Sequence, residues 1–212
     1  MALPVQPKTI YGEHVNTPIG RVSFPHVFSP RENELKIDKK TGKPVLEYEI
    51  TLLFDKTADL GPLKKEIARV AKLAEYNLTD GSTVVSCIKD GNVAYKKDPE
   101  KNAIQKDKIV VIARSRLKPG LIDRDQLPIL NPNEFYGGCY ARIQVQPKTW
   151  HQLTGHGIIL DLVNIQKAKD GEPFGRIKPS ASSSFDAIEP DLSETQGEAD
   201  EFNVFGSAED DL

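Results

Sequence analysis

Charge of one sign is missing from the C-terminal end of the chain. The last 34 residues, 179–212, contain ten Asp or Glu and no Lys or Arg. The whole chain has 28 basic and 31 acidic residues, so removing these ten acids leaves a body of net charge +7 joined to a tail of net charge −10. A basic body favours a polyanionic partner, because Lys and Arg release the counterions condensed on phosphates. The sequence therefore predicts a nucleic-acid-binding module with a regulatory acidic tail.

Long apolar runs and cysteines are also scarce. No stretch approaches the ~20 apolar residues that span a bilayer, and residues 1–4 lack the charged and apolar regions of a signal peptide. The two cysteines, Cys87 and Cys139, lie far apart in the sequence. In a chain of this composition we expect them to be reduced and buried. The sequence thus predicts a cytoplasmic protein that has no membrane contact.

Motifs of the common enzyme classes are absent from the sequence: it has no Walker loop, no Gly-x-Ser-x-Gly and no His-Glu-x-x-His. His151 and His156 are five residues apart in a predicted loop, and no spacing of histidines and cysteines matches a zinc site. Glu47 and Glu49 share one strand face, where a metal-dependent nuclease would need a carboxylate cluster, but such a pair is usually just solvated. We therefore expect no enzymatic activity, no cofactor and no metal.

The body has the sequence pattern of a mainly β domain. Five segments are predicted as strands, because apolar and β-branched residues alternate or cluster in them: residues 20–28, 45–54, 108–116, 139–145 and 157–166. In the second of these, Leu46, Ile50 and Phe54 are expected on one face, with Glu47 and Glu49 on the other. One helix is predicted over residues 62–77, after a Gly-Pro start. The charged stretch 80–107 contains turn signals and suggests no function.

Five short strands with one helix are typical of the OB fold, a five-stranded Greek-key barrel. We predict an OB-fold domain over residues 1–178 and a disordered acidic tail over residues 179–212. OB folds bind oligonucleotides on the face of strands 2 and 3 and with the loops joining strands 1–2 and 4–5. The predicted loop 1–2, residues 31–44, carries Arg31, Lys36, Lys39, Lys40 and Lys43. The predicted loop 4–5, residues 146–156, holds the only tryptophan. The helix follows strand 2, unlike the usual position between strands 3 and 4.

A basic groove with aromatic side chains for base stacking is the usual site for single-stranded nucleic acid. We predict phosphate contacts from Arg114, Arg116, Arg142, Lys148, Lys39 and Lys40, and base stacking on Tyr136, Tyr140 and Trp150. Tyr140 and Arg142 are expected on the same outward face of the fourth strand. The pair Gly137-Gly138 would allow a bulge or a close approach of backbone to ligand. The alternative for each aromatic is a packing role, at the end of the barrel or half-buried.

The segment Asn133-Glu134-Phe135-Tyr136-Gly137-Gly138-Cys139-Tyr140, followed by residues 155–166 and Gly171-Glu-Pro-Phe-Gly175, resembles a family of tailed-phage single-stranded-DNA-binding proteins long catalogued as a domain of unknown function. Thr17-Pro-Ile-Gly-Arg-Val-Ser-Phe24 and Leu52-Leu53-Phe54-Asp55-Lys56 extend the resemblance over roughly residues 15–176. It implies an OB fold that coats single-stranded DNA during phage replication and recombination in a bacterial host cell, without catalysis or cofactor. It also implies DNA contacts around residues 136–142.

The acidic tail is similar in kind to the tails of bacterial and other phage single-strand binders, which recruit replication proteins. Those tails often end in an aromatic residue, whereas this chain ends at Leu212 with Phe202 and Phe205 set inward. The expected partners are single-stranded DNA and, through the tail, replication or recombination proteins. Two alternatives stay open: a structural or protein-interaction module on a barrel scaffold, and a metal-dependent nuclease. The sequence also leaves open double-strand binding and the oligomeric state, a homo-oligomer included.

Overall fold

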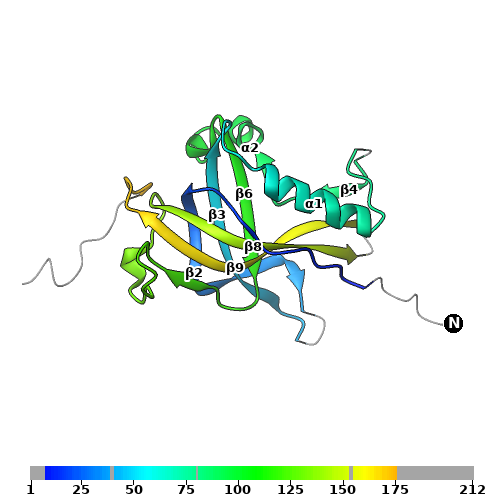
Figure 1. Cartoon of the computed structure of the whole chain (residues 1–212), viewed down its shortest axis with the longest axis horizontal. Coiled ribbons are helices and arrows are strands. Elements are labelled where there is room, and N and C mark those ends of the chain that lie inside the picture. The colour runs from blue at the N-terminus through cyan, green and yellow to red at the C-terminus, as the bar shows by residue number, and fades with distance from the viewer. Residues whose placement is uncertain (1–7, 39–40, 80, 153–154, 176–212) are drawn as a thin grey trace, which may run out of the picture. The chain divides into compact units, whose positions relative to one another are not determined.

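Five long strands close into a barrel in the computed structural model, which describes residues 8–38, 41–79, 81–152 and 155–175 (Figure 1). Its strands are β2 (Gly20–Ile37), β3 (Pro44–Asp55), β6 (Lys108–Ser115), β8 (Tyr140–Gln152) and β9 (Gly155–Lys169). β3 pairs antiparallel with β2 and β6, β6 pairs parallel with β9, and β8 pairs antiparallel with β9 and β2, which closes the ring. The predicted mainly β, OB-like class is confirmed, and each barrel strand overlaps one of the five predicted segments.

Short elements decorate the barrel. β1 (Val15–Asn16) pairs with β8, β5 (Ile88–Asp90) pairs with β6, and both β4 (Thr83–Val85) and β7 (Gly120–Ile122) pair with β9. Two 3₁₀ turns, Ala103–Gln105 and Pro132–Glu134, lie in the connections. The prediction of a single helix was wrong, because the described residues also contain α2 (Gly91–Lys97) within the charged stretch. The Asp90 side chain begins α2 by accepting a hydrogen bond from the Asn92 N–H, a short-range cap inside a stretch too charged to show helical periodicity.

The predicted helix is α1 (Gly61–Leu73), which begins with proline in its first turn as expected. Its buried stripe consists of Leu63, Ile67, Val70 and Ala71, and it packs against β1, β8 and β9. The helix ends four residues before the predicted Asn77 because Glu75 takes a φ of 57°, outside helical conformation. None of the helices among the described residues is long and apolar enough to cross a membrane.

The core is built from the inner faces of the barrel strands and the buried stripe of α1. Ile50, Leu52 and Phe54 of β3 are buried, as the alternation of this strand predicts. Cys87 and Cys139 are both buried, as expected, and neither forms a disulfide in the structure. One part of the β3 prediction was wrong: Leu46 is 53% exposed, whereas Glu47 and Glu49 are each 7% exposed. The strand extends past the core at Leu46, while cationic side chains of neighbouring strands cover the two carboxylates.

The two predicted binding loops are mostly paired strands. β2 and β3 stay paired to Ile37 and Pro44, and β8 and β9 stay paired to Gln152 and Gly155. We call these extensions the β2–β3 arm (residues 31–47) and the β8–β9 arm (residues 146–160). Register shifts in β2, between Ser23 and His26 and again between His26 and Arg31, let this strand bend while it remains in the sheet. The prediction of loops failed because a hairpin carrying polar side chains on both faces lacks the alternation that marks a strand.

Candidate nucleic-acid interface

A cavity of about 830 Å³ is lined by residues of both hairpin arms. We call it the groove. The β2 side contributes His26 and residues 31–34 and 36, the β6 side contributes Ile112 and Arg114, and the β8–β9 arm contributes Trp150, Ile159 and Leu160. Ser86, Cys87 and Lys89, from the connection between α1 and β6, complete its wall. The groove thus lies where OB folds bind oligonucleotides, between the connections of strands 1–2 and 4–5.

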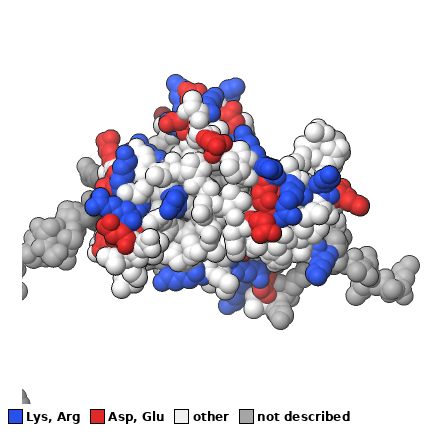
Figure 2. All heavy atoms as spheres, in the orientation of Figure 1, with Lys and Arg blue, Asp and Glu red and all other residues white. Residues whose placement is uncertain are grey.

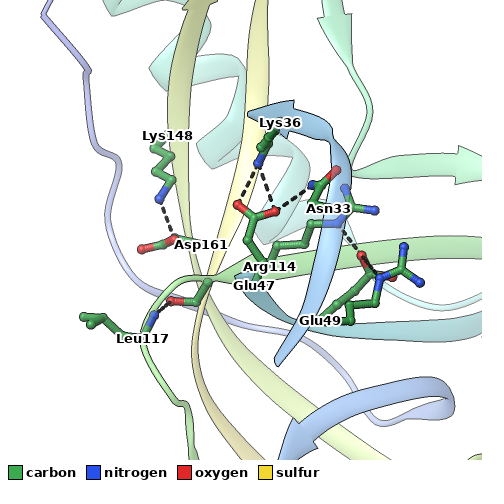
Figure 3. Close-up of polar contacts among 10 residues, drawn as sticks. Asn33, Lys36, Glu47, Glu49, Arg114, Leu117, Lys148 and Asp161 are labelled. Carbon is green, nitrogen blue, oxygen red and sulfur yellow. Dashed lines mark hydrogen bonds and ion pairs between the residues drawn. The ribbon is translucent and has the colours of Figure 1, made fainter. Parts of the chain in front are cut away.

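Three of the four basic side chains in the groove, Arg31, Lys36 and Arg114, contact buried carboxylates (Figure 3). Arg114 Nε donates to Glu49 Oε2, and Arg31 Nε lies 4.0 Å from the same oxygen. Lys36 Nζ donates to Glu47 Oε1 at 2.8 Å, and Asn33 Nδ2 donates to Glu47 Oε2 at 2.8 Å. These contacts join β2, β3 and β6 across their outer surface. They also cancel, at close range, much of the positive charge that the sequence places there.

The Glu47 carboxylate shows how this balance is kept. Burial by itself raises the pKa of Glu47, because it penalises the charged form. Hydrogen bonds from Lys36 and Asn33, with the charges of Lys36 and Arg114, lower it by more, so the pKa of Glu47 lies below its usual value of 4.5. Glu47 is therefore ionised at neutral pH and keeps Lys36 in place. This pair of acids on one strand face belongs to an ion-pair network and is not solvated as expected.

The predicted phosphate contacts fall into three groups. Arg114 lines the groove in its ion pair, and Lys148 forms a similar pair on β8, with its Nζ 2.5 Å from Asp161 Oδ1. Arg116 and Arg142 are exposed and have no ion pair with another described residue, although Arg142 Nε donates to Gln166 Oε1 at 2.9 Å. Lys39 and Lys40 lie outside the described residues, as does the predicted tail. In the space-filling view, basic and acidic side chains alternate over α1 (Figure 2). The charged side chains along the lower edge of the molecule in this view are mostly basic.

The predicted stacking residues are not gathered in one place. Trp150 lines the groove but is half-buried, with its indole against the backbone of the β8–β9 arm: a Cβ on Gly157 would lie 2.8 Å from Trp150 Nε1. That Nε1 is buried and finds no hydrogen-bond partner among the described residues. The Tyr136 hydroxyl donates to Gly171 O at 3.0 Å, so this residue anchors the segment after β9. Stacking on these side chains stays a prediction.

Tyr140 lies in a second cavity of about 460 Å³, which we call the β2-start cavity. Its lining includes Arg21, Phe54, Lys108 and Phe174, and it shares no residue with the groove. Arg142 lines a third, smaller hollow with Gln144 and Asn164. Tyr140 and Arg142 lie on the outward face of β8, as expected, since Cys139, Ala141 and Ile143 are buried, but they line different hollows.

Three cationic or titratable residues at these cavities escaped the sequence reasoning: His26, Lys89 and Arg21. His26 carried a usable signal, since it lies in a predicted strand just before the basic residues of the β2–β3 arm. Lys89 carried none. It reaches the groove because β5 pairs with β6, and nothing local in the charged stretch predicts that pairing. The described residues contain no group of three or more His, Cys, Asp or Glu that could hold a metal ion.

A family model described as Enterobacter phage Enc34, ssDNA-binding protein, matches residues 13–200, which include both arms and both large cavities. The chain belongs to this family. Similar solved structures include the single-stranded DNA-binding protein from bacteriophage Enc34 in complex with ssDNA, with 30% identity and a TM-score of 0.58 over 76% of this chain and 89% of that one. Another structure of the Enc34 protein is 28% identical, with a TM-score of 0.56 over 82% and 90% of the two chains. No curated protein matches. The family expected from the sequence is confirmed.

Proposed function

We propose that this member of the Enc34 family is a non-enzymatic protein that coats single-stranded DNA during phage replication and recombination, and that the strand lies in the groove. The observation that carries the proposal is the groove itself. It is a cavity of about 830 Å³ with four basic side chains on its walls, Arg31, Lys36, Lys89 and Arg114, and a tryptophan on the opposite arm. The family match and the ssDNA complex of the Enc34 protein support the same ligand.

Within the groove, the basic residues contact phosphates and Trp150 offers an aromatic surface to a base. Arg31 is half-exposed, and its Nε is only at the 4.0 Å limit of contact with Glu49, so its guanidinium has donors left for a phosphate. Lys89 is exposed and has no ion pair with another described residue. Base stacking in such sites contributes about 1–3 kcal/mol per base and tolerates any sequence. We therefore expect binding with little base preference.

The acidic tail modulates this binding in the proposal. Its net charge of −10 stands against +7 on residues 1–178, so it competes with DNA for the basic surface at low salt. Once DNA occupies that surface, the tail is free to recruit replication or recombination proteins. Phe202 and Phe205 supply apolar anchors for such partners.

Binding of the full chain and of residues 1–178 to fluorescent oligo-dT and to a matching duplex, over a range of salt, tests the proposal. We expect preference for the single strand, a log–log salt slope of about −0.7 per phosphate contacted, and tighter binding by the truncated form at low salt. Equal affinities of the two forms would refute tail competition. Absence of binding by either form at ~50 mM salt would refute DNA binding, and DNA cleavage dependent on Mg²⁺ or Mn²⁺ would refute a non-enzymatic role.

A protein-interaction module is the second candidate, and one observation favours it. The connection between β6 and β8 exposes three leucines: Leu117 is 79% exposed, Leu127 63% and Leu130 84%. Several large exposed apolar side chains in one connection are a feature that a protein partner could cover. A protein with this role alone would bind no oligonucleotide in the assay above.

A further inference from the structure

Arg21 lines the β2-start cavity, and Lys169 lies beside Tyr140 at the same cavity. The Arg21 guanidinium lies 4.3 Å from the centroid of the Phe174 ring and 5.9 Å from that of Tyr140. Its Nη2 donates to Glu172 O at 2.7 Å and its Nε to Gly138 O, whereas its Nη1 donors have no partner among the residues that the structure describes. Lys169 Nζ lies 4.7 Å from the Tyr140 ring centroid. Neither cation forms an ion pair with another described residue.

The floor of this cavity is apolar and open. Ile19, Leu53, Phe54 and Ala58 line it, and Ile19 is 56% exposed. Lys108, which is paired with Asp55, lies at its edge. A cavity with an apolar floor, aromatic edges and unpaired cations matches a nucleotide unit, whose base is flat and apolar on its faces and whose phosphate is anionic.

Phe24 lies on β2 between the two cavities, in a conformation that costs free energy. Its φ is 47°, a left-handed value that is a real outlier for a bulky side chain, and its side chain is 54% exposed. Packing of the half-exposed ring therefore offsets little of the backbone strain. The position falls in the register shift between Ser23 and His26, where the strand bulges outward. Strain of this kind, held by surrounding structure, is concentrated at ligand-contact sites.

The two cavities are close enough for one strand of DNA to reach both. Arg21 lines the β2-start cavity and His26 lines the groove, five residues further along β2. At ~3.3 Å per residue this separation is about 17 Å. OB-fold sites accommodate roughly 4–16 nucleotides, so the longer of these sites can span both cavities.

We infer that the DNA track continues past the groove along β2: Phe24 stacks on a base, and the β2-start cavity holds a further nucleotide of the same strand, with Arg21 and Lys169 at its phosphate and Tyr140 and Phe174 at its base. This inference rests on the proposed function. It adds a second subsite that explains both the strained phenylalanine and the unpaired cations.

Phe24→Gly in the full chain tests the inference, because glycine adopts a φ of 47° without strain and removes the ring. We expect a thermal midpoint no lower than that of the wild type and an affinity for ~16-nucleotide oligo-dT reduced about five-fold or more, the loss of one stacked base. The affinity for a ~4-nucleotide oligomer, which fills the groove alone, is expected to stay the same. The matched control is Leu73→Ala on α1, where the side chain is 55% exposed and lines neither cavity.

Arg21→Gln and its charge-matched control Lys65→Gln give a second comparison. We expect Arg21→Gln alone to make the salt slope for the longer oligomer shallower by about 0.7, the value for one phosphate contact. Because Arg21 also holds residues 138 and 172, photo-cross-linking of the wild-type chain to a 5-iododeoxyuridine oligomer provides a readout without mutation. Cross-links to Phe24 and to Tyr140 or Phe174 would support the subsite. Wild-type affinity of Phe24→Gly for the longer oligomer, or cross-links only to groove residues, would overturn it and leave the groove intact. No binding by the wild type would refute the proposed function itself.

Discussion

Glu49→Gln should weaken the fold and strengthen DNA binding. Glu49 is 7% exposed and accepts a hydrogen bond from Arg114 while it attracts Arg31. Glutamine keeps the shape and one acceptor oxygen but removes the negative charge. Both arginines then present an unneutralised charge to the groove, so each gains attraction for a phosphate.

The size of both effects follows from the structure. Hydrogen bonds to charged groups contribute about 1.5–3 kcal/mol, and the side chains of Arg114 and Arg31 are 31% and 49% exposed, so water compensates part of the loss. We expect the free energy of unfolding to fall by about 1–2 kcal/mol. For single strands each further phosphate contact adds about −0.7 to the log–log salt slope, which over a fourfold rise in salt is a factor of about 2.6. If both arginines make one further phosphate contact each, the affinity should fall about sevenfold more over the same rise in salt than it does for the wild type.

Oligo-dT binding at 50 and 200 mM salt, with urea unfolding of the same samples, measures both quantities. The control is Glu100→Gln, which removes the same charge at an exposed position that lines neither cavity. Glu49→Gln should bind more tightly than this control at the lower salt and lose more affinity at the higher salt. An unchanged slope, together with the expected loss of stability, would mean that the two arginines serve the fold and not the DNA.

Three further predictions concern stability and reactivity. Because the pKa of Glu47 is lowered in the folded state, the ionised carboxylate stabilises the fold above pH 4.5, and this contribution is lost as the pH falls through the lowered pKa. Glu47→Gln should therefore flatten the acid side of a plot of unfolding free energy against pH. An unaltered profile would contradict the ion-pair network. Burial raises the pKa of the Cys87 thiol to about 11, so we expect a thiol reagent at pH 8 to label it only as fast as the protein unfolds; rapid labelling of the native chain at Cys87 would show that the groove floor opens. Gly138→Ala should destabilise the protein by about 2 kcal/mol or more, because Gly138 has a φ of 118° and an added Cβ would lie 2.2 Å from Glu172 O. At Gly137 the nearest atoms to an added Cβ lie 3.9 Å away. Gly137→Ala should therefore leave the thermal midpoint of unfolding nearly unchanged.

Much of the fold was predictable because the signals are local. Alternation in residues 45–54 and the apolar start of residues 108–116 predicted two barrel strands, and the spacing of Leu63, Ile67 and Val70 predicted α1. The register shifts and α2 were not predictable in the same way. A bulge such as the one at Phe24 depends on which partner residue pairs across the sheet, and the sequence of one strand does not contain that information.

The candidate site was predicted less well than the fold. The sequence named Arg114 and Trp150, which both line the groove, but it also grouped Tyr140 and Arg142 with them, and these two line other cavities. It treated Arg114 as free for phosphate, although Glu49, 65 positions earlier in the chain, accepts its hydrogen bond. Counting charged residues along the chain gives the net charge, but it does not show which cations form ion pairs.

The sequence by itself determined the class of barrel, its five strands and single long helix, the division of charge between body and tail, and the family of phage single-strand binders. The barrel class, the strands, the helix and the charge division depend on side-chain periodicity and composition, which are properties of each segment alone, whereas the family was identified from the resemblance of its motifs. Only the tertiary structure decided where the groove lies, which of its cations are neutralised, and that unpaired cations and aromatic rings meet at the other end of β2. The physical reason is that the tertiary structure brings together residues far apart in sequence. Sheet register places Glu49 beside Arg114, and the segment after β9 places Phe174 against Arg21. Ion pairing in a partly buried site depends on such proximity.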